Sequence, residues 1–140
     1  MKLVCELNAV YPIHCKADEH YFIRGAELPR DIYSGEVDED EVSAALGFVC
    51  HSMVMLSKYL SIPLRYRMVC NSSRSAIQED GAQILPLFMS RVVERDQLGR
   101  GLSLLHRNLE CLLKTRDVAT DQSHILGKLQ KLYESIIGNR

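Results

Sequence analysis

The sequence lacks an excess of charge of either sign. Its 17 lysine and arginine residues are balanced by 18 aspartate and glutamate residues, which gives a formal net charge of −1. Proteins that bind nucleic acid usually concentrate basic residues on one face of the domain. We therefore expect no nucleic-acid partner. The 140 residues, 46% of them hydrophobic, suffice for one domain with a single buried core.

The sequence also has no long uncharged apolar run. A membrane span needs about 20 predominantly apolar residues, and we find no stretch of that length free of charge and turn residues. The apolar run at the N-terminus is interrupted early by Glu6, which is not typical of a signal peptide. These absences predict a cytoplasmic protein without a membrane-spanning helix.

Paired cysteines are missing as well. The five cysteines are an odd number, contain no C-x-x-C motif and match no zinc framework. We expect free, buried thiols in a reducing compartment, with no metal and no cofactor. The cysteines are Cys5, Cys15, Cys50, Cys70 and Cys111.

The serine cluster after Asn71 lacks the context of a catalytic nucleophile. Ser72, Ser73 and Ser75 are not in a G-x-S-x-G motif, and no histidine–carboxylate pair lies nearby in the sequence. Asparagine and serine side chains readily bond to their own backbone, so the cluster predicts a turn. A small thiol- or serine-dependent enzyme ranks last among the functional hypotheses, and no catalytic residue is expected.

Two other candidate sites have structural interpretations. The segment Gly99-Arg100-Gly101 is too short for a phosphate loop and has no lysine after it, so Gly101 is interpreted as a close-packing position on a helix. His51 lies inside a predicted helix, where a hydrogen-bonded or solvent-facing role is favoured over general-base chemistry.

Three segments have helical periodicity. The first starts at an acidic run in which Asp38 is expected to cap the helix, and its apolar residues continue from Val42 to Leu60. This helix is apolar on most of its faces, which predicts a largely buried central helix. The second runs from about Arg95 to Lys114. The third is predicted from Thr120, as N-cap, to Ile137, with Gly138 as its stop.

Short segments of β-prone or alternating composition fill the remainder. Pro86 confines the last of them to a sheet edge. The order of strands and helices predicts an α+β fold with internally repeated strand–helix units, rather than a doubly wound sheet. The predicted strands are Lys2–Tyr11, His20–Arg24, Leu64–Cys70, Ser75–Gln78 and Ile84–Met89.

Arginines form the remaining candidate site. Several follow the predicted strands and are expected to gather near one sheet edge, where they would meet an anionic lipid or an acidic partner. Exposed strand positions also suit arginine without any function, so both interpretations stay open. The candidate contacts are Arg65, Arg67, Arg74, Arg91 and Arg95, with Arg100 nearby and Val92 and Val93 as an apolar tip.

Several passages resemble a known family. They are "ELNAVYPIH", "HYFIRGAELP", "ALGFVCHSMVMLSKYLSIPLRYRMV", "SSRSAI" and "LPLFMSRV". From about Glu6 to Ile136 the chain resembles the C-terminal domain of the UV radiation resistance-associated (UVRAG) family and, more distantly, the β–α repeat domain of Beclin. The most specific part is the helix–proline–strand passage that ends in "LRYRMV", with "SRSAI" at a fixed distance.

The resemblance implies one β–α repeat (BARA-like) domain over residues 1–140, with residues 1–5 as a lead-in. In this fold, short sheets alternate with helices around a pseudo-symmetric centre. The resemblance also implies a non-catalytic adaptor in a class III phosphatidylinositol 3-kinase complex, peripheral on endosomal or autophagic membranes. A Beclin-like protein and lipid-kinase subunits would be its partners. The alternative is a stand-alone module that binds anionic membranes through a basic patch.

The chain departs from the family pattern in two ways. We find no counterpart of the family's N-terminal membrane-binding domain and long coiled coil. In the Beclin relatives, exposed aromatic residues follow "LPLY" and insert into membranes. Here "LPLF" is followed by "MSRVVERDQLG", and the sequence has no tryptophan. Attraction between arginines and anionic lipid is therefore expected in place of aromatic insertion at this loop.

Overall fold

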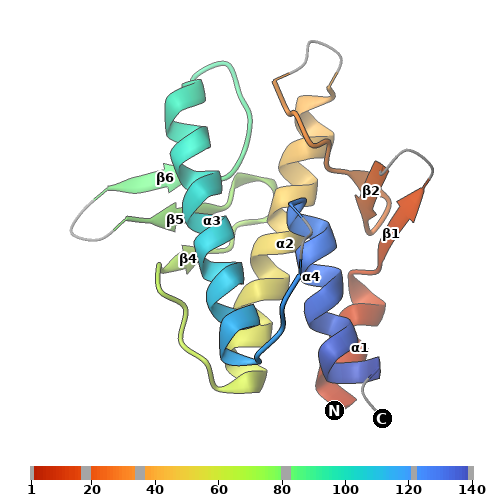
Figure 1. Ribbon diagram of the computed structural model, residues 1–140. Helices are drawn as coiled ribbons and strands as arrows, with labels where there is room; N and C mark the ends of the chain where they lie inside the picture. Colours follow the sequence, from red (N-terminus) through yellow and green to blue (C-terminus); the bar gives the residue numbers. More distant parts are fainter. Residues whose placement is uncertain (1, 17–19, 34–36, 80–82, 121–122, 139–140) are drawn as a thin grey trace.

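The computed structural model describes residues 2–16, 20–33, 37–79, 83–120 and 123–138. Within them lie four α-helices and two three-stranded antiparallel sheets, which confirms the α+β prediction. Figure 1 shows the two sheets on opposite sides of the long helix α2 (Glu39–Leu60). The first sheet consists of β1 (Ile13–Lys16), β2 (His20–Ile23) and β3 (Ala26–Glu27), and the second of β4 (Met68–Val69), β5 (Ala76–Gln78) and β6 (Ile84–Pro86).

The strand–helix unit occurs twice in the described chain. In each sheet the strands lie side by side in sequence order, and a long helix follows: α2 after the first sheet and α3 (Arg95–Thr115) after the second. This repetition confirms the predicted internal repeat. Two further helices, α1 (Lys2–Val10) and α4 (Ile125–Tyr133), flank α2, and a π-helical turn at Glu134–Gly138 extends α4.

The first predicted strand is wrong, because residues 2–10 form α1. Val4 and Leu7 are three positions apart, which places them on one face of a helix, and both are buried. That face packs against α2 and the end of the chain around Glu134–Gly138. The strand that pairs with β2 is instead β1, which follows Pro12, with Ile13 opposite Ile23.

The third predicted helix begins later than expected. Helix α4 begins at Ile125, and its N-cap is His124 rather than Thr120. The His124 ring is buried, and its Nδ1 atom accepts a hydrogen bond from the Leu126 amide at 3.1 Å, while Nε2 lies 2.7 Å from the Leu28 carbonyl oxygen. A histidine cap of this kind is decided by tertiary contacts, because histidine is not a strong local capping signal.

Helix α2 lies at the centre of the core, as the apolar residues on most of its faces predict. Its N-terminus is capped by Asp38, whose carboxylate accepts hydrogen bonds from the Asp40 and Glu41 amides. Contrary to expectation, α2 is long and apolar enough by composition to cross a membrane. However, 56% of its most apolar 18-residue window is buried inside the protein, so α2 serves here as a core helix.

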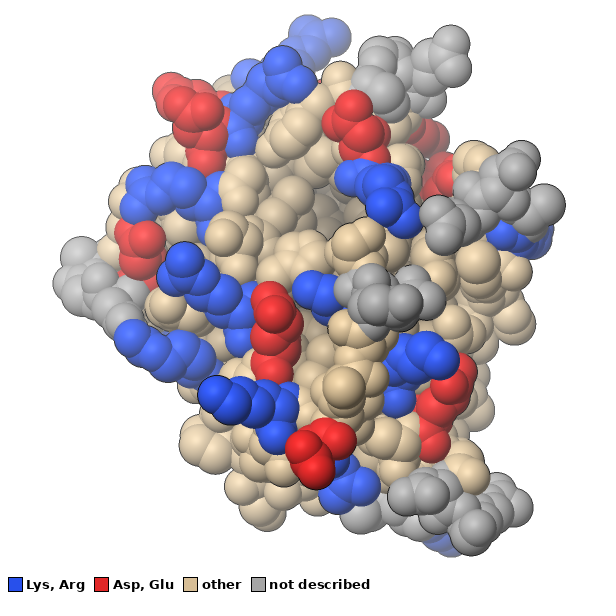
Figure 2. All heavy atoms as spheres, in the orientation of Figure 1, with Lys and Arg blue, Asp and Glu red and all other residues tan. Residues whose placement is uncertain are grey.

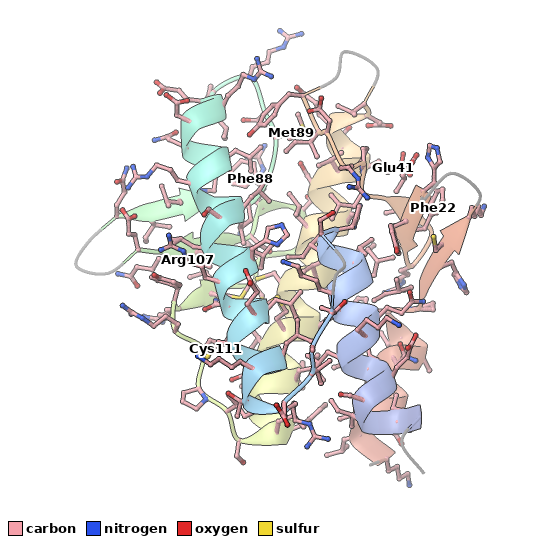
Figure 3. All side chains as sticks on the ribbon, in the orientation of Figure 1. Phe22, Glu41, Phe88, Met89, Arg107 and Cys111 are labelled. Atoms are coloured by element: carbon pink, nitrogen blue, oxygen red, sulfur yellow. The ribbon has the colours of Figure 1, made fainter. Side chains whose placement is uncertain are left out.

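Side chains of α2 tie both sheets to it. The Glu41 carboxylate reaches back from the start of α2 and accepts a hydrogen bond from the Glu27 amide of β3 at 2.8 Å (Figure 3). On the other side, the buried Ser43 hydroxyl accepts a hydrogen bond from the Met89 amide at 2.9 Å, just after β6. The central helix therefore fixes the start of each sheet–helix connection.

The β4 strand is shorter than the alternation of residues 64–70 predicts. Only Met68 and Val69 pair with the return strand β5. Tyr66 faces the core as expected, yet its amide and carbonyl bond to the side chain of Asn108 on α3 and not to a strand. The buried asparagine therefore replaces the first part of the predicted ladder.

Two glycines allow backbones to approach these helices. A Cβ atom on Gly101 of α3 would lie 2.7 Å from the Pro86 carbonyl oxygen, which confirms the predicted close-packing role. A Cβ atom on Gly47 of α2 would overlap the Ser72 carbonyl oxygen. The loop after β4 thus packs directly on the backbone of the central helix.

Replacing Gly47 by alanine is expected to lower the free energy of unfolding by about 3 kcal/mol, because the added methyl group overlaps a backbone carbonyl that side-chain rotation cannot move. Urea denaturation measures the difference. Gly99→Ala is the matched control on α3: its new Cβ meets only the Tyr33 hydroxyl at 3.8 Å, so helix propensity should stabilise that variant by roughly 0.5–1 kcal/mol. Equal stability of the two variants would contradict the close approach at Gly47.

Candidate functional site

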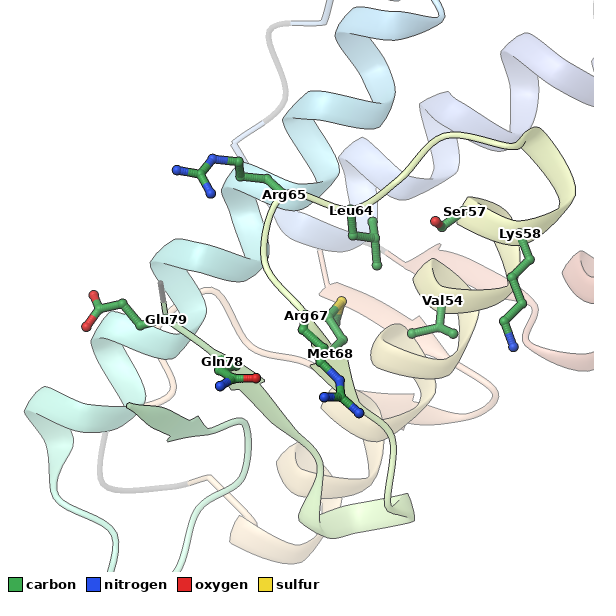
Figure 4. A pocket seen from close by; sticks show the side chains of 9 residues that line it. All are labelled: Val54, Ser57, Lys58, Leu64, Arg65, Arg67, Met68, Gln78 and Glu79. Atoms are coloured by element: carbon green, nitrogen blue, oxygen red, sulfur yellow. The ribbon is translucent and has the colours of Figure 1, made fainter. Parts of the chain in front are cut away.

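A hollow of about 500 Å³ lies between the C-terminal half of α2 and the second sheet (Figure 4). Three cationic side chains line it: Lys58 from the last turn of α2, and Arg65 and Arg67 from the segment leading into β4. We call this the cationic hollow. Val54 and Leu64 supply apolar wall, and Gln78 and Glu79 border it at the end of β5.

Local structure explains how the cations come together. Helix α2 ends at Leu60 with Ser61 as its C-cap, which adopts a left-handed conformation (φ 55°), and Pro63 follows two residues later. The chain then turns back along α2, and the Asn108 side chain holds the backbone of Tyr66. With Tyr66 buried, its neighbours Arg65 and Arg67 both remain exposed, as alternating positions require.

The electrostatic balance of the cationic hollow is positive. Its one acidic residue, Glu79, pairs with Arg100 of α3. Arg65 lies over the Tyr66 ring, 4.8 Å from its centroid. Arg67 and Lys58 have no ion-pair partner within the described part of the chain. An anionic group of a ligand or partner is therefore the chemistry that this hollow favours.

The structure does not bring the other predicted arginines into the cationic hollow. Arg74 lies 5.2 Å over the ring of Phe88, and Arg95, at the start of α3, lies 4.3 Å over the ring of Tyr33. Asn108, which holds the Tyr66 backbone between Arg65 and Arg67, is 13 positions further along α3 than Arg95. At 1.5 Å per residue, roughly 20 Å of helix separates Arg95 from Asn108. On the face shown in Figure 2, basic side chains are interspersed with acidic ones.

The predicted apolar tip lies in the connection between β6 and α3. Val92 is 85% exposed and Arg91 beside it is also exposed, whereas Val93 is half-buried against the core. Only one of the two valines is therefore available for an apolar contact.

Lys58 lines the cationic hollow, although the sequence analysis does not single it out. It lies on the predicted helix rather than on a strand, so it was not grouped with the arginines. Its position two residues before the end of α2, just ahead of the turn that precedes Pro63, is the signal that could have identified it. A cation in the last turn of a helix also interacts favourably with the helix dipole.

A second cavity is smaller and more apolar. It measures about 160 Å³ and lies between the segment after β3, α3 and the start of α4. His106 and His124 line it. Burial, together with the nearby Lys128 ammonium, lowers the pKa of His106, and His124 is occupied as the cap of α4. These histidines therefore have structural roles in the cavity wall.

The remaining candidates have the structural roles that the sequence indicates. Ser72–Arg74 form a 3₁₀ turn, and the Ser75 hydroxyl, which is buried, donates to the Ser72 carbonyl. His51 is exposed and lies 2.6 Å from the Tyr11 hydroxyl through Nδ1. In the described ranges no three His, Cys, Asp or Glu side chains form a metal-binding group.

The prediction that the cysteines are buried is wrong for four of the five. All five are free thiols, but only Cys50 is buried; Cys111 is intermediate and Cys5, Cys15 and Cys70 are exposed. The thiol of Cys50 lies 3.1 Å from that of Cys70. Nothing in the spacing of these two cysteines indicated that they would meet, because their contact depends on how the loop after β4 packs on α2.

Comparison with known proteins relates the whole chain to one group. No family model matches the sequence. The chain is 29% identical over 141 residues to UV radiation resistance-associated protein of Mus musculus, covering 95% of this chain and 20% of that protein. It is 29% identical over 144 residues to vacuolar protein sorting-associated protein 38 of Schizosaccharomyces pombe, covering 98% of this chain and 30% of that protein.

A third relative extends the range of organisms. The chain is 26% identical over 153 residues to UV radiation resistance-associated gene protein of Drosophila melanogaster, covering 96% of this chain and 22% of the relative. The chain thus spans less than a third of the length of the curated relatives that it matches. Over nearly its whole length, it is a homologue of the UV radiation resistance-associated and vacuolar protein sorting-associated 38 proteins.

Proposed function

We propose that this chain is a non-catalytic adaptor domain of a class III phosphatidylinositol 3-kinase complex that acts in autophagy and endosomal trafficking. The observation that carries the proposal is the similarity over 95–98% of the chain to two relatives, one of which is named for vacuolar protein sorting. A Beclin-like protein and lipid-kinase subunits are the proposed partners. The adaptor works from endosomal or autophagic membranes as a peripheral protein.

The fold supports an adaptor role. Two short sheets leave strand edges at the surface, among them β4, where Val69 is 40% exposed, and β6, where Ile84 is 59% exposed. Exposed strand edges with apolar side chains are suited to protein contacts, because main-chain groups and side chains bind together. Because the cationic hollow lies beside β4, a contact at this edge would favour a partner with acidic residues.

Co-expression tests the adaptor proposal. The chain is produced together with a Beclin-like protein and the lipid kinase, and the mixture is separated by size-exclusion chromatography. We expect the chain to co-elute with its partners. A chain that elutes alone, while circular dichroism shows the helical content of the folded domain, would contradict the proposal.

A second candidate function rests on the cationic hollow. We propose as the alternative a stand-alone module that binds anionic membranes through basic residues, led by Lys58, Arg65 and Arg67. Each lysine or arginine close to the surface of an anionic bilayer contributes about 1 kcal/mol to the free energy of binding. The attraction acts within about a Debye length, so it should weaken as salt is raised.

The double variant Arg65→Gln/Arg67→Gln tests the alternative. We expect it to sediment with phosphatidylserine vesicles about thirtyfold more weakly than the unmodified chain, because two contributions of about 1 kcal/mol are lost. Arg74→Gln/Arg95→Gln removes the same charge outside the cationic hollow and should bind nearly as well as the unmodified chain. If neither the chain nor its variants sediment at low salt, the membrane alternative is wrong and the adaptor proposal is unaffected.

A further inference from the structure

Cys50 and Cys70 form a pair of thiols that the proposed adaptor role does not use. Cys50 lies in the middle of α2 and is buried, whereas Cys70 follows β4 and is exposed. Their sulfur atoms are 3.1 Å apart, and either can donate a hydrogen bond to the other. A disulfide bond is about 2.05 Å long, so an approach of about 1 Å would join them.

The surrounding backbone holds the two thiols in this position. The loop after β4 packs on α2 where Gly47 leaves space for the Ser72 carbonyl. Within the loop, the Ser75 hydroxyl donates to the Ser72 carbonyl at 2.9 Å and accepts from the Asn71 amide at 3.1 Å. The loop that carries Cys70 is thus fixed to the helix that carries Cys50, and little chain movement is needed for a bond.

The two thiols differ in reactivity. The hydrogen bond from Cys50 lowers the pKa of the Cys70 thiol, and the Lys58 ammonium lowers it further, against an opposing effect of burial. The same hydrogen bond, together with burial, raises the pKa of Cys50. Because thiolates are the reactive form, Cys70 is the nucleophile and Cys50 is the thiol that resolves the product.

Small oxidants can reach Cys70 but not Cys50 directly. Cys70 lines a hollow of about 560 Å³ together with Tyr11, Arg24 and His51. A hydroperoxide has room to enter this hollow. Cys50 lies behind it, so its sulfur meets the product at Cys70 rather than the oxidant itself.

We propose that Cys50 and Cys70 are a hydroperoxide-sensitive dithiol that forms a reversible disulfide. The Cys70 thiolate attacks the terminal oxygen of the hydroperoxide, whose O–O bond breaks. Cys70 becomes a sulfenic acid, and the released alkoxide or hydroxide takes a proton from water. Cys50 sulfur then attacks Cys70 sulfur, the S–O bond breaks, and the departing hydroxide takes the Cys50 proton and leaves as water. Two thiols are oxidised by two electrons and one hydroperoxide is reduced; a small dithiol reverses the bond by exchange.

Oxidation would fix α2 to the β4 end of the second sheet. The two cysteines are separated by about 20 residues, and cross-linking a loop of this size restricts the unfolded chain. We expect the melting temperature of the oxidised chain to rise by about 10 °C and to return to the reduced value after treatment with dithiothreitol.

The test treats the chain with a small molar excess of hydrogen peroxide, blocks the remaining thiols by alkylation, and identifies linked peptides by mass spectrometry. We expect a Cys50–Cys70 peptide and the loss of two of the five free thiols. Cys15→Ala is the matched control and should give the same link. A link between any other pair, or none, would overturn the proposal.

Trapping of the intermediate separates the two roles. In Cys50→Ser, which lacks the resolving thiol but keeps a hydroxyl that can donate a hydrogen bond to Cys70, dimedone added together with hydrogen peroxide should label Cys70 at least about tenfold faster than the exposed Cys15. Equal labelling of the two would show that Cys70 is not activated. If Cys50→Ser does not fold, Cys70→Ser replaces an exposed thiol and decides the question. It should keep its melting temperature and lose the peroxide-dependent rise, whereas a rise that persists would overturn the proposal.

Discussion

Replacing Leu56 by aspartate is expected to lower the free energy of unfolding by about 5 kcal/mol or more. Leu56 is fully buried on α2, in the centre of the core. The change removes about 2–3 kcal/mol of apolar burial, and it places a carboxylate among apolar side chains where it has no partner. Small domains are stable by only about 5–15 kcal/mol, so the variant should be largely unfolded or severely destabilised at room temperature.

Leu3→Asp is the matched control for this prediction. Leu3 is 51% exposed and lies in the first turn of α1, where an acidic side chain also suits the helix dipole. Its effect on stability should stay within about 0.5 kcal/mol. Urea denaturation followed by circular dichroism measures both variants. An unchanged transition midpoint for Leu56→Asp would show that this face of α2 is not the buried one.

The two long helices could be predicted from the sequence because their local signals agree with their tertiary contacts. In α2, an acidic run with Asp38 as cap precedes a long apolar segment, and in α3 leucines recur at helical spacing. In both, most residues on the predicted face are buried. When capping, periodicity and packing agree in this way, the bounds of a helix can be predicted from the sequence alone.

Helix α1 could not be recognised in the same way. It has nine residues and carries only two buried side chains, Val4 and Leu7, so its periodicity is short and its composition resembles that of a strand. Packing against α2 and the end of the chain decides its conformation. The start of α4 is similar, since the His124 ring caps it only because the segment after β3 lies beside it.

Only part of the candidate site could be predicted from the sequence. Arg65 and Arg67 were identified from alternation along one strand, and the structure places both in the cationic hollow. Lys58 joins them through the turn at the end of α2, and Arg95 is excluded by its distance along α3. Residues far apart in sequence meet here through backbone contacts that no single segment specifies.

The contact between the Asn108 side chain and the Tyr66 backbone likewise could not be predicted from either segment alone, and removing it is expected to have a large effect on stability. Asn108 is fully buried, its Oδ1 atom accepts a hydrogen bond from the Tyr66 amide at 2.9 Å, and its Nδ2 atom donates to the Tyr66 carbonyl at 2.9 Å. Asn108→Leu keeps the number and branching of the side-chain heavy atoms and removes both bonds, leaving the Tyr66 amide and carbonyl without partners. Each uncompensated group costs about 1–3 kcal/mol, so a loss of about 4 kcal/mol is expected.

Asn71→Leu is the control for this variant, because Asn71 is exposed and its side chain makes no capping hydrogen bond. Its stability should remain within about 0.5 kcal/mol of the unmodified chain. Thermal unfolding and urea denaturation compare the two. A loss confined to Asn108→Leu would establish the contact, whereas similar stabilities would show that the Tyr66 backbone finds water or other partners.

Asn108→Asp tests the direction of each hydrogen bond separately. An ionised aspartate still accepts from the Tyr66 amide but opposes its carbonyl oxygen, whereas a protonated aspartate donates to that oxygen. Burial and the facing carbonyl should raise the folded-state pKa of this carboxyl above its unfolded value of about 3.9. The folded state then binds more protons, so the stability of Asn108→Asp should decrease as the pH rises from about 3.9 through the folded-state pKa. Relative to the unmodified chain, the variant should therefore be least impaired in acid, and a deficit independent of pH would contradict the assigned donor at Nδ2.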